Sequence, residues 1–178
     1  MFEAFFDEAW QKTRGQEEAM PTVQLQAVRS VCNLLEAQLN GKNADKKKVA
    51  AYFGFAFIWG VCACFKSIRF VDNMLRDFFG KLHIPMSETV FEYYYNEKEG
   101  RFVHWNRAVP AFTYDSRLPF FSLLVPTVET TRTTALLDLL QGKPVFLTGS
   151  TGVGKSVIVQ SYLRGSQGAT PISLTFSA

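Results

Sequence analysis

The sequence has few residues suited to hold a metal ion or a disulfide bond. Three cysteines and two histidines occur among its 178 residues. Cys62 and Cys64 stand two positions apart, which would place them on different faces of a helix. Neither His83 nor His104 has a partner at the spacing of a zinc site. An odd number of cysteines in so apolar a chain favours reduced thiols and a cytoplasmic protein, and argues against a metal centre.

The chain also has little excess of one charge over the other. The net charge of +3 is too small to indicate a nucleic-acid partner, and the run of lysines at 46–48 is typical of a solvated loop or helix end. Aromatic side chains beside basic residues can stack on nucleobases, but Lys98 and Arg101 are balanced here by neighbouring glutamates. We therefore expect no nucleic acid to bind.

The longest uncharged stretch is too short for a membrane span. Residues 49–65 carry no charge, but a spanning helix needs about 20 apolar residues. Another aromatic helix is expected directly afterwards, at 68–79, without a polar boundary. The first eight residues are acidic where a signal peptide would be basic. We expect residues 49–65 to form a buried central helix and expect no membrane partner.

Periodicity predicts the other elements before residue 119. Apolar residues at helical spacing favour helices at 2–14 and from Thr22 to Gly41, and Thr22, after Pro21, is the expected N-cap of the second helix. Two aromatic, β-prone runs at 90–96 and 101–105 predict a hairpin, with Gly100 at a positive φ in the loop between them. Prolines then indicate an extended connector; they are Pro110, Pro119 and Pro126.

A motif near the C-terminal end predicts a phosphate-binding loop. Residues 149–156 read Gly-Ser-Thr-Gly-Val-Gly-Lys-Ser, which matches the pattern G-x-x-x-x-G-K-[ST]. Its three glycines permit backbone angles that aim successive N–H groups into one concavity. A helix N-terminus behind that concavity attracts a polyphosphate. Lys155 would reach the outer phosphates, and the Ser156 hydroxyl would coordinate Mg²⁺.

The flanking residues suit an α/β domain. Residues 144–148 are apolar and β-prone, as a buried parallel strand would be, and residues 156–163 read as the following helix. A second strand is expected at 171–176, and the later part of 127–140 is expected to be helical. The fold class is therefore mixed: a helical part with a hairpin, then the start of an α/β nucleotide-binding domain.

Two stretches in this region resemble the start of the third AAA+ module of dynein heavy chains. They are Leu-Val-Pro-Thr-Val-Glu-Thr-Thr-Arg at 124–132 and the run from Val145 to Ile158. Within that run, the residues at 151–158 are most similar to those of axonemal dyneins. Upstream, residues 31–36, 55–59 and the hairpin before Trp105 resemble the segment that joins the second and third modules. Glu129 stands where the family usually has aspartate, a conservative difference.

The resemblance implies a division and a binding site. Residues 1–118 would be the helical extension or lid, and residues 119–178 the N-terminal part of an AAA+ P-loop domain. ATP or ADP, with Mg²⁺, would be held by the phosphate loop, and Val125, Pro126 and Thr127 would lie beside the adenine. The phosphate-loop residues implied are Gly149, Ser150, Thr151, Gly152, Val153, Gly154, Lys155 and Ser156.

The same resemblance implies the larger machine. Dynein heavy chains form a ring that drives minus-end-directed movement along microtubules. The expected partners are the other AAA+ modules of the heavy chain, the light and intermediate chains, and microtubules. The expected location is the cytoskeleton, in the axoneme of a cilium or flagellum.

Hydrolysis by this chain alone is not expected. No aspartate or glutamate follows Lys155, so no Walker B carboxylate is present to position a water molecule. The sensor residue and an arginine finger would also come from elsewhere. One alternative stays open from the sequence: a non-catalytic helical interaction fragment whose P-loop is not assembled.

Overall fold

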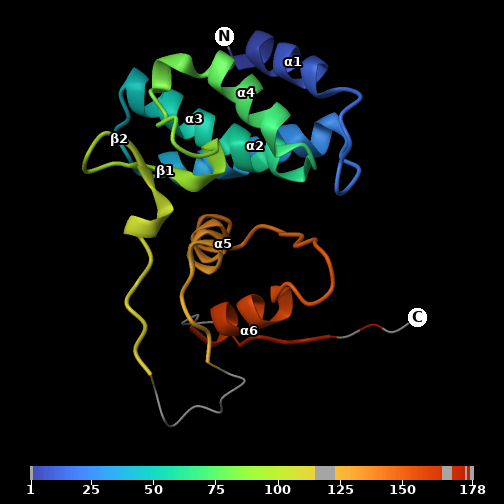
Figure 1. Cartoon of the computed structure of the whole chain (residues 1–178), viewed down its shortest axis with the longest axis vertical. Helices are drawn as coiled ribbons and strands as arrows, with labels where there is room; N and C mark the ends of the chain where they lie inside the picture. The colour runs from blue at the N-terminus through green and yellow to red at the C-terminus, as the bar shows by residue number, and fades with distance from the viewer. Residues whose placement is uncertain (1, 115–122, 166–169, 175, 177–178) are drawn as a thin grey trace.

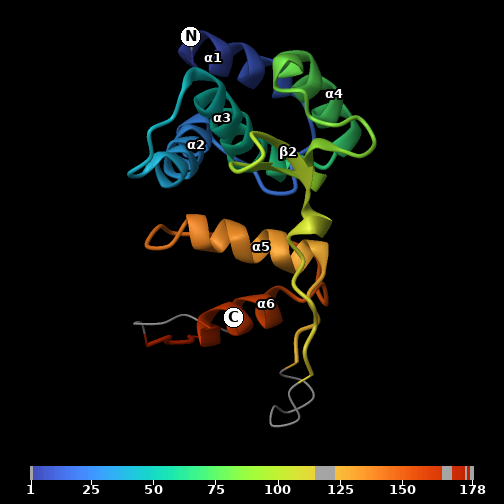
Figure 2. The same cartoon turned by 90° about the vertical axis from the view of Figure 1, so that its left-hand side faces the viewer.

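The computed structural model describes residues 2–114, 123–165, 170–174 and 176. Figures 1 and 2 show α1–α4 and the β-hairpin gathered at one end, with α5 lying between them and α6. We call residues 2–107 the helical domain and the described residues from 123 onward the P-loop region. The helices are α1 (Phe2–Thr13), α2 (Gln24–Leu39), α3 (Lys46–Gly60), α4 (Ile68–Phe78), α5 (Val128–Leu139) and α6 (Lys155–Gly165), and the strands are β1 (Tyr93–Asn96) and β2 (Arg101–His104).

Helix α3 is the centre of the helical domain. It begins at Lys46, three residues earlier than expected, because the Asp45 carboxylate accepts the backbone N–H of Lys48 at 2.8 Å and caps the helix. Residues 51–58 are all buried, as expected for a core helix. The α-helix ends at Gly60, however, and residues 62–64 form a 3₁₀ turn, so the helix expected over 49–65 is shorter at its C-terminal end. The stretch Lys46–Cys64 is long and apolar enough to cross a membrane by length and composition, but 56% of its most apolar window is buried inside the protein.

Aromatic rings fill the space between α1, α3 and α4. Phe5 contacts the rings of Phe53 and Phe57 at centroid distances of 5.4 and 5.5 Å. It also meets Phe78 and Phe79, both at 4.9 Å. Most of these pairs have the edge-to-face geometry that aromatic rings prefer. The 68–79 helix therefore packs on the uncharged helix, as the sequence predicts.

Helices α2 and α3 pack closely. A Cβ built on Gly60 would lie 2.9 Å from the backbone nitrogen of Val31, so only glycine fits there. The Gln38 amide of α2 donates to the Tyr52 carbonyl of α3 at 3.3 Å and to the Leu34 carbonyl of its own helix at 3.0 Å. Helix α2 itself begins at Gln24 with Val23 at its N-cap, so the prediction that Thr22 caps this helix is wrong. Thr22 is tied instead to Glu18, whose carboxylate accepts its N–H at 2.6 Å.

The hairpin is present but shorter than predicted. Strands β1 and β2 pair antiparallel, with Tyr93 opposite His104 and Asn96 opposite Arg101. Gly100 has φ +63°, as expected for the loop. Residues 90–92 and 105–107 form 3₁₀ turns rather than strand. These ends are fixed by side chains instead of by a ladder: Asp72 accepts the Val90 N–H at 2.7 Å, and the His104 ring accepts the Asn106 N–H.

Helix α5 is better defined than the sequence suggests. Thr127 and Thr130 form a capping box, in which each side chain accepts a backbone N–H of the other residue, so the helix starts at Val128. Leu136, Leu139 and Leu140 pack against the core of the helical domain.

Both predicted strands of the P-loop region are wrong. Residues 144–148, 171–174 and 176 are not in strands, and Thr175 lies outside the described residues. The side chain of Phe146 is 76% exposed and that of Ile172 is 81% exposed. A strand forms only when a neighbour pairs with its backbone groups, and no described segment pairs with either stretch. The boundary expected at 118/119, and Pro119, also lie outside the described residues.

Candidate phosphate-binding loop

The loop at 149–156 has the backbone of a glycine-dependent turn. Gly152 and Gly154 have φ values of +85° and +82°, in the left-handed region that disfavours other residues. Gly149 has φ +151°. Lys155 and Ser156 form the first turn of α6, so the loop leads directly into a helix N-terminus, where free N–H groups and the helix dipole favour an anion.

Lys155 lies over the loop. Its ammonium donates to the Gly149 carbonyl at 2.9 Å and to the Ser150 carbonyl at 2.7 Å. A lysine that can close on the loop is placed to approach a phosphate there, because only these weak carbonyl partners have to be exchanged. The residues from Gly149 to Val153 are exposed, so the loop is open to solvent.

Helix α6 is held on α5. The two helices are in contact, and Tyr162 of α6 lies beside Asp138 of α5. Burial, and then the neighbouring Asp138 carboxylate, raise the pKa of Tyr162. The helix that follows the phosphate loop is thus fixed to the helix that precedes it.

The predicted adenine-side residues lie at the start of α5. Val125 is exposed and Pro126 half-buried, both outside any helix or strand, and Thr127 is the N-cap residue. Within the described residues, no hydrogen bond joins them to the loop at 149–156. At this helix start, the pKa of Glu129 is lowered. The largest cause is a hydrogen bond that its carboxylate accepts from its own backbone N–H, and the next is a bond from the Thr127 hydroxyl. Whether these residues touch an adenine ring stays a prediction.

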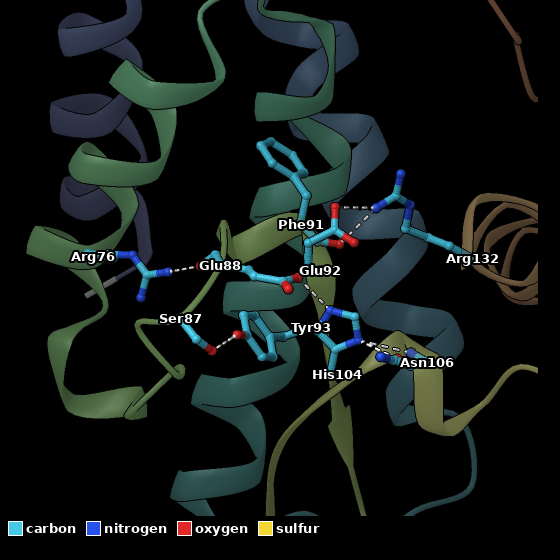
Figure 3. Close-up of polar contacts among 9 residues, drawn as sticks. All are labelled: Arg76, Ser87, Glu88, Phe91, Glu92, Tyr93, His104, Asn106 and Arg132. Carbon is cyan, nitrogen blue, oxygen red and sulfur yellow. Dashed lines mark hydrogen bonds and ion pairs between the residues drawn. The ribbon is translucent and has the colours of Figure 1, made fainter. Parts of the chain in front are cut away.

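The sequence analysis missed a polar cluster that joins α5 to the helical domain (Figure 3). Arg132 donates to a Glu92 carboxylate oxygen at 3.1 Å and to the Phe91 carbonyl at 3.2 Å. Its guanidinium also lies 5.2 Å from the centre of the Trp59 ring. The only signal for Arg132 in the sequence was its place at the end of the 124–132 stretch. Its hydrogen-bond partners, Phe91 and Glu92, are 41 and 40 residues away in the sequence and cannot be found from local spacing.

His104 belongs to the same cluster. The carboxylates of Glu88 and Glu92 and the His104 ring lie within 4.8 Å of one another, a combination able to ligate a metal ion. Each already has a partner: Glu92 pairs with Arg132, and His104 bonds Glu88 and Asn106 at 2.6 Å each. The bond to Glu88, more than any other cause, raises the pKa of His104, and burial partly opposes it. The arrangement is an ion-pair network whose residues lie far apart in the sequence and are brought together by the fold.

A cavity of about 730 Å³ opens between α2, the hairpin and α5. Its wall includes Tyr52, Trp105 and Asp138, and no residue of the phosphate loop. The loop at 149–153 is exposed to solvent, and this cavity lies apart from it, at the contact between the helical domain and α5.

The three cysteines are free thiols, as expected. Burial raises the pKa of Cys62 well above its ordinary value and also raises that of Cys64. Neither thiol is therefore activated as a nucleophile.

A helical domain followed by a glycine-rich phosphate loop at a helix N-terminus defines a P-loop nucleotide-binding segment. Comparison with known families gives the same result. Residues 1–107 match the family described as dynein heavy chain AAA lid domain, and residues 112–178 match the P-loop containing dynein motor region. The chain belongs to the dynein heavy chain family.

Individual relatives agree. The chain is 36% identical over 152 residues to the ciliary dynein beta chain of Heliocidaris crassispina. That alignment covers 79% of this chain and 3% of the relative. It is 33% identical over 178 residues to mouse dynein axonemal heavy chain 2, and 30% identical over 177 residues to mouse dynein axonemal heavy chain 17. These two matches each cover 92% of this chain and 4% of the relative. The chain thus corresponds to a small part of the length of these relatives.

Proposed function

We propose that this chain is the ATP-binding segment of an axonemal dynein motor, part of a ring that drives movement along microtubules. ATP or ADP with Mg²⁺ would bind the loop at 149–156. Lys155 would pair with the β- and γ-phosphates, Ser156 would ligate the metal, and Val125–Thr127 would lie beside the adenine. The observation that carries the proposal is the phosphate loop at the N-terminus of α6 within a chain of dynein family membership.

The loop fits a polyphosphate chemically. Its glycines provide left-handed backbone at two positions, and Lys155 donates to two carbonyls there, with no carboxylate among the described residues paired to it. An anion would gain a charge-assisted contact without breaking an ion pair. The alternative of a helical interaction fragment with an unassembled P-loop is less favoured, because the family match extends through the loop to residue 178.

Turnover of ATP would need groups from outside this chain. No acidic residue follows Lys155, so this chain offers a cradle, a lysine and a metal-binding hydroxyl but no group to orient a water molecule. We propose that residues 1–118 act as the lid and residues 119–178 as the first part of the nucleotide-binding domain. The proposed partners are the other AAA+ modules, light and intermediate chains, and microtubules, in the axoneme of a cilium or flagellum.

Nucleotide binding to the purified chain tests the proposal. Lys155→Ala should remove a contact worth about 1.5–3 kcal/mol and weaken Mg·ATP binding at least tenfold. Lys143→Ala is the matched control, since Lys143 pairs with Glu36 on the surface at 3.0 Å and lies outside the loop. Equal affinity in the parent chain and Lys155→Ala would rule out this placement.

A further inference from the structure

Helix α5 links the helical domain to the phosphate loop. At its start, Thr127 belongs to the proposed adenine-side segment and caps the helix. Near its end, α5 contacts α6, the helix that begins at Lys155, and Asp138 lies beside Tyr162 there. Figures 1 and 2 show α5 lying between the helical domain and α6. A shift of α5 relative to the helical domain would therefore move both sides of the proposed nucleotide site.

One side chain of α5 is anchored deeply in the helical domain. Arg132 uses the same guanidinium for an ion pair with Glu92, a bond to the Phe91 carbonyl, and a stack on Trp59. Its side chain is only 19% exposed. The Trp59 ring meets the Phe91 ring edge-on at 5.5 Å, so the aromatic partner is itself held in place. Arginine is suited to this position, because lysine lacks a planar group that can stack and bond at once.

The segment that holds the partners of Arg132, residues 90–92, is itself fixed in place. The Val90 N–H bonds the Asp72 carboxylate at 2.7 Å, and Asp72 pairs with Arg76 on α4 at 2.9 Å. Arg76 in turn donates to the carbonyls of Pro85 at 3.0 Å and Glu88 at 2.5 Å. Residues 90–92 are thus fixed to α4, and the partners of Arg132 are not free to follow it.

We propose that Arg132 is a positioning residue that fixes α5 to the helical domain and couples the helical domain to nucleotide binding. The coupling rests on the proposed function, whereas the anchoring of α5 by Arg132 does not. Arg132 sets the position of the segment before Thr127 and, through α6, that of the phosphate loop. Because coupling between two sites is reciprocal, nucleotide binding also stabilises the contact of Arg132 with residues 91 and 92.

A second ion pair between the same two regions provides the contrast. Lys143, which follows α5, pairs with Glu36 of α2 at 3.0 Å, but these side chains are 40% and 69% exposed. Exposed pairs of this kind contribute little. The proposal therefore expects a large effect from Arg132 and a small effect from Lys143, although both substitutions remove one positive charge.

Hydrogen exchange of the whole 178-residue chain, followed by mass spectrometry without nucleotide, tests the anchoring role. Arg132→Ala should speed exchange in residues 123–131 at least fivefold, and Lys143→Ala less than twofold. Exchange in residues 51–58 should stay at the parent rate in both variants, which shows that the helical domain is folded. Arg132→Lys should give an intermediate rate. Adding Glu92→Gln to Arg132→Ala should cause no further increase, because the two residues act on one contact.

Nucleotide binding tests the coupling. Arg132→Ala should weaken Mg·ATP binding about three- to tenfold, and Mg·ATP should slow exchange in residues 90–96 of the parent chain but not of Arg132→Ala. If 123–131 exchanges equally in Arg132→Ala and Lys143→Ala, the anchoring role is overturned. If Arg132→Ala binds Mg·ATP as tightly as the parent chain does, or if Mg·ATP leaves exchange in residues 90–96 of the parent unchanged, the coupling is overturned. If the parent chain itself binds no nucleotide, the proposed function fails and so does the coupling, while the exchange rates without nucleotide still decide the anchoring.

Discussion

The helical domain and the P-loop region bury their residues very differently. All described residues that are buried lie between Phe6 and Trp105, and none lies in the described part of the chain after residue 122. Both regions contain apolar side chains in quantity. The difference is that helices α1–α4 find their partners within about 100 residues of sequence, whereas the apolar residues at 145–147 and 172–176 remain exposed.

This contrast shows what each architecture needs. A helix satisfies its own backbone hydrogen bonds and needs only a neighbour for its apolar face. A parallel strand needs neighbours for its backbone as well as for its side chains, and those neighbours come from distant sequence. The helical domain can therefore be stable on its own contacts, and the P-loop region is expected to depend on strands that pair with 144–148.

The largest test of this contrast replaces one phenylalanine in each region. Phe57 is fully buried and Phe146 is 76% exposed. Phe57→Ala should lower the free energy of unfolding by about 3–5 kcal/mol, because it leaves a cavity among the aromatic rings. Phe146→Ala should change it by less than about 0.5 kcal/mol. Urea unfolding followed by far-UV circular dichroism measures both, and equal losses would contradict the contrast.

A smaller effect is expected where α2 and α3 meet. Gly60→Ala places a methyl group 2.9 Å from the Val31 backbone nitrogen, and should cost about 1–3 kcal/mol of stability as the helices move apart. Gly54→Ala is the control. Its Cβ would come too close to Leu82 Cδ1 alone, at 2.6 Å, which is the end of a side chain that can rotate away, and would touch the Phe79 ring at the ordinary contact distance of 3.7 Å. Alanine also favours the helix by roughly 0.5–1 kcal/mol. A Gly60→Ala chain as stable as the parent would show that the helices pack more loosely than described.

The smallest effect concerns pH. The folded-state pKa of His104 is raised, chiefly by its hydrogen bond to Glu88. The protonated His104 therefore adds to the free energy of unfolding at pH values below its unfolded pKa of about 6.5, and this contribution is lost as the pH rises through the folded pKa. Water screens the half-exposed Glu88, which limits the loss to about 0.5 kcal/mol. Glu88→Gln should lower the pKa of His104 in an NMR titration, and Glu8→Gln on α1 should not. An unchanged titration in Glu88→Gln would remove Glu88 as the cause.

Local patterns in the sequence were sufficient for the presence of the helices, though not for all of their ends, for the hairpin loop at Gly100, and for the glycine-dependent turn at 149–154 that leads into α6. They failed at 144–148 and 171–176, where β-prone composition indicates a strand but cannot supply its neighbour. Spacing also missed the contacts of Arg132 and His104, since their partners are brought together only by the packing of α5, α3 and the hairpin. Residues whose role depends on local backbone were therefore predictable, and residues whose role depends on distant contacts were not.

Hydrogen exchange along the whole chain tests the central claim most directly, namely that the helical domain is self-sufficient and the P-loop region is not. We expect slow exchange in residues 51–58 and 71–75, and fast exchange across 144–148 and 170–174. Slow exchange across 144–148 that matches α3 would contradict the claim, because it would mean that this segment is already paired as a strand.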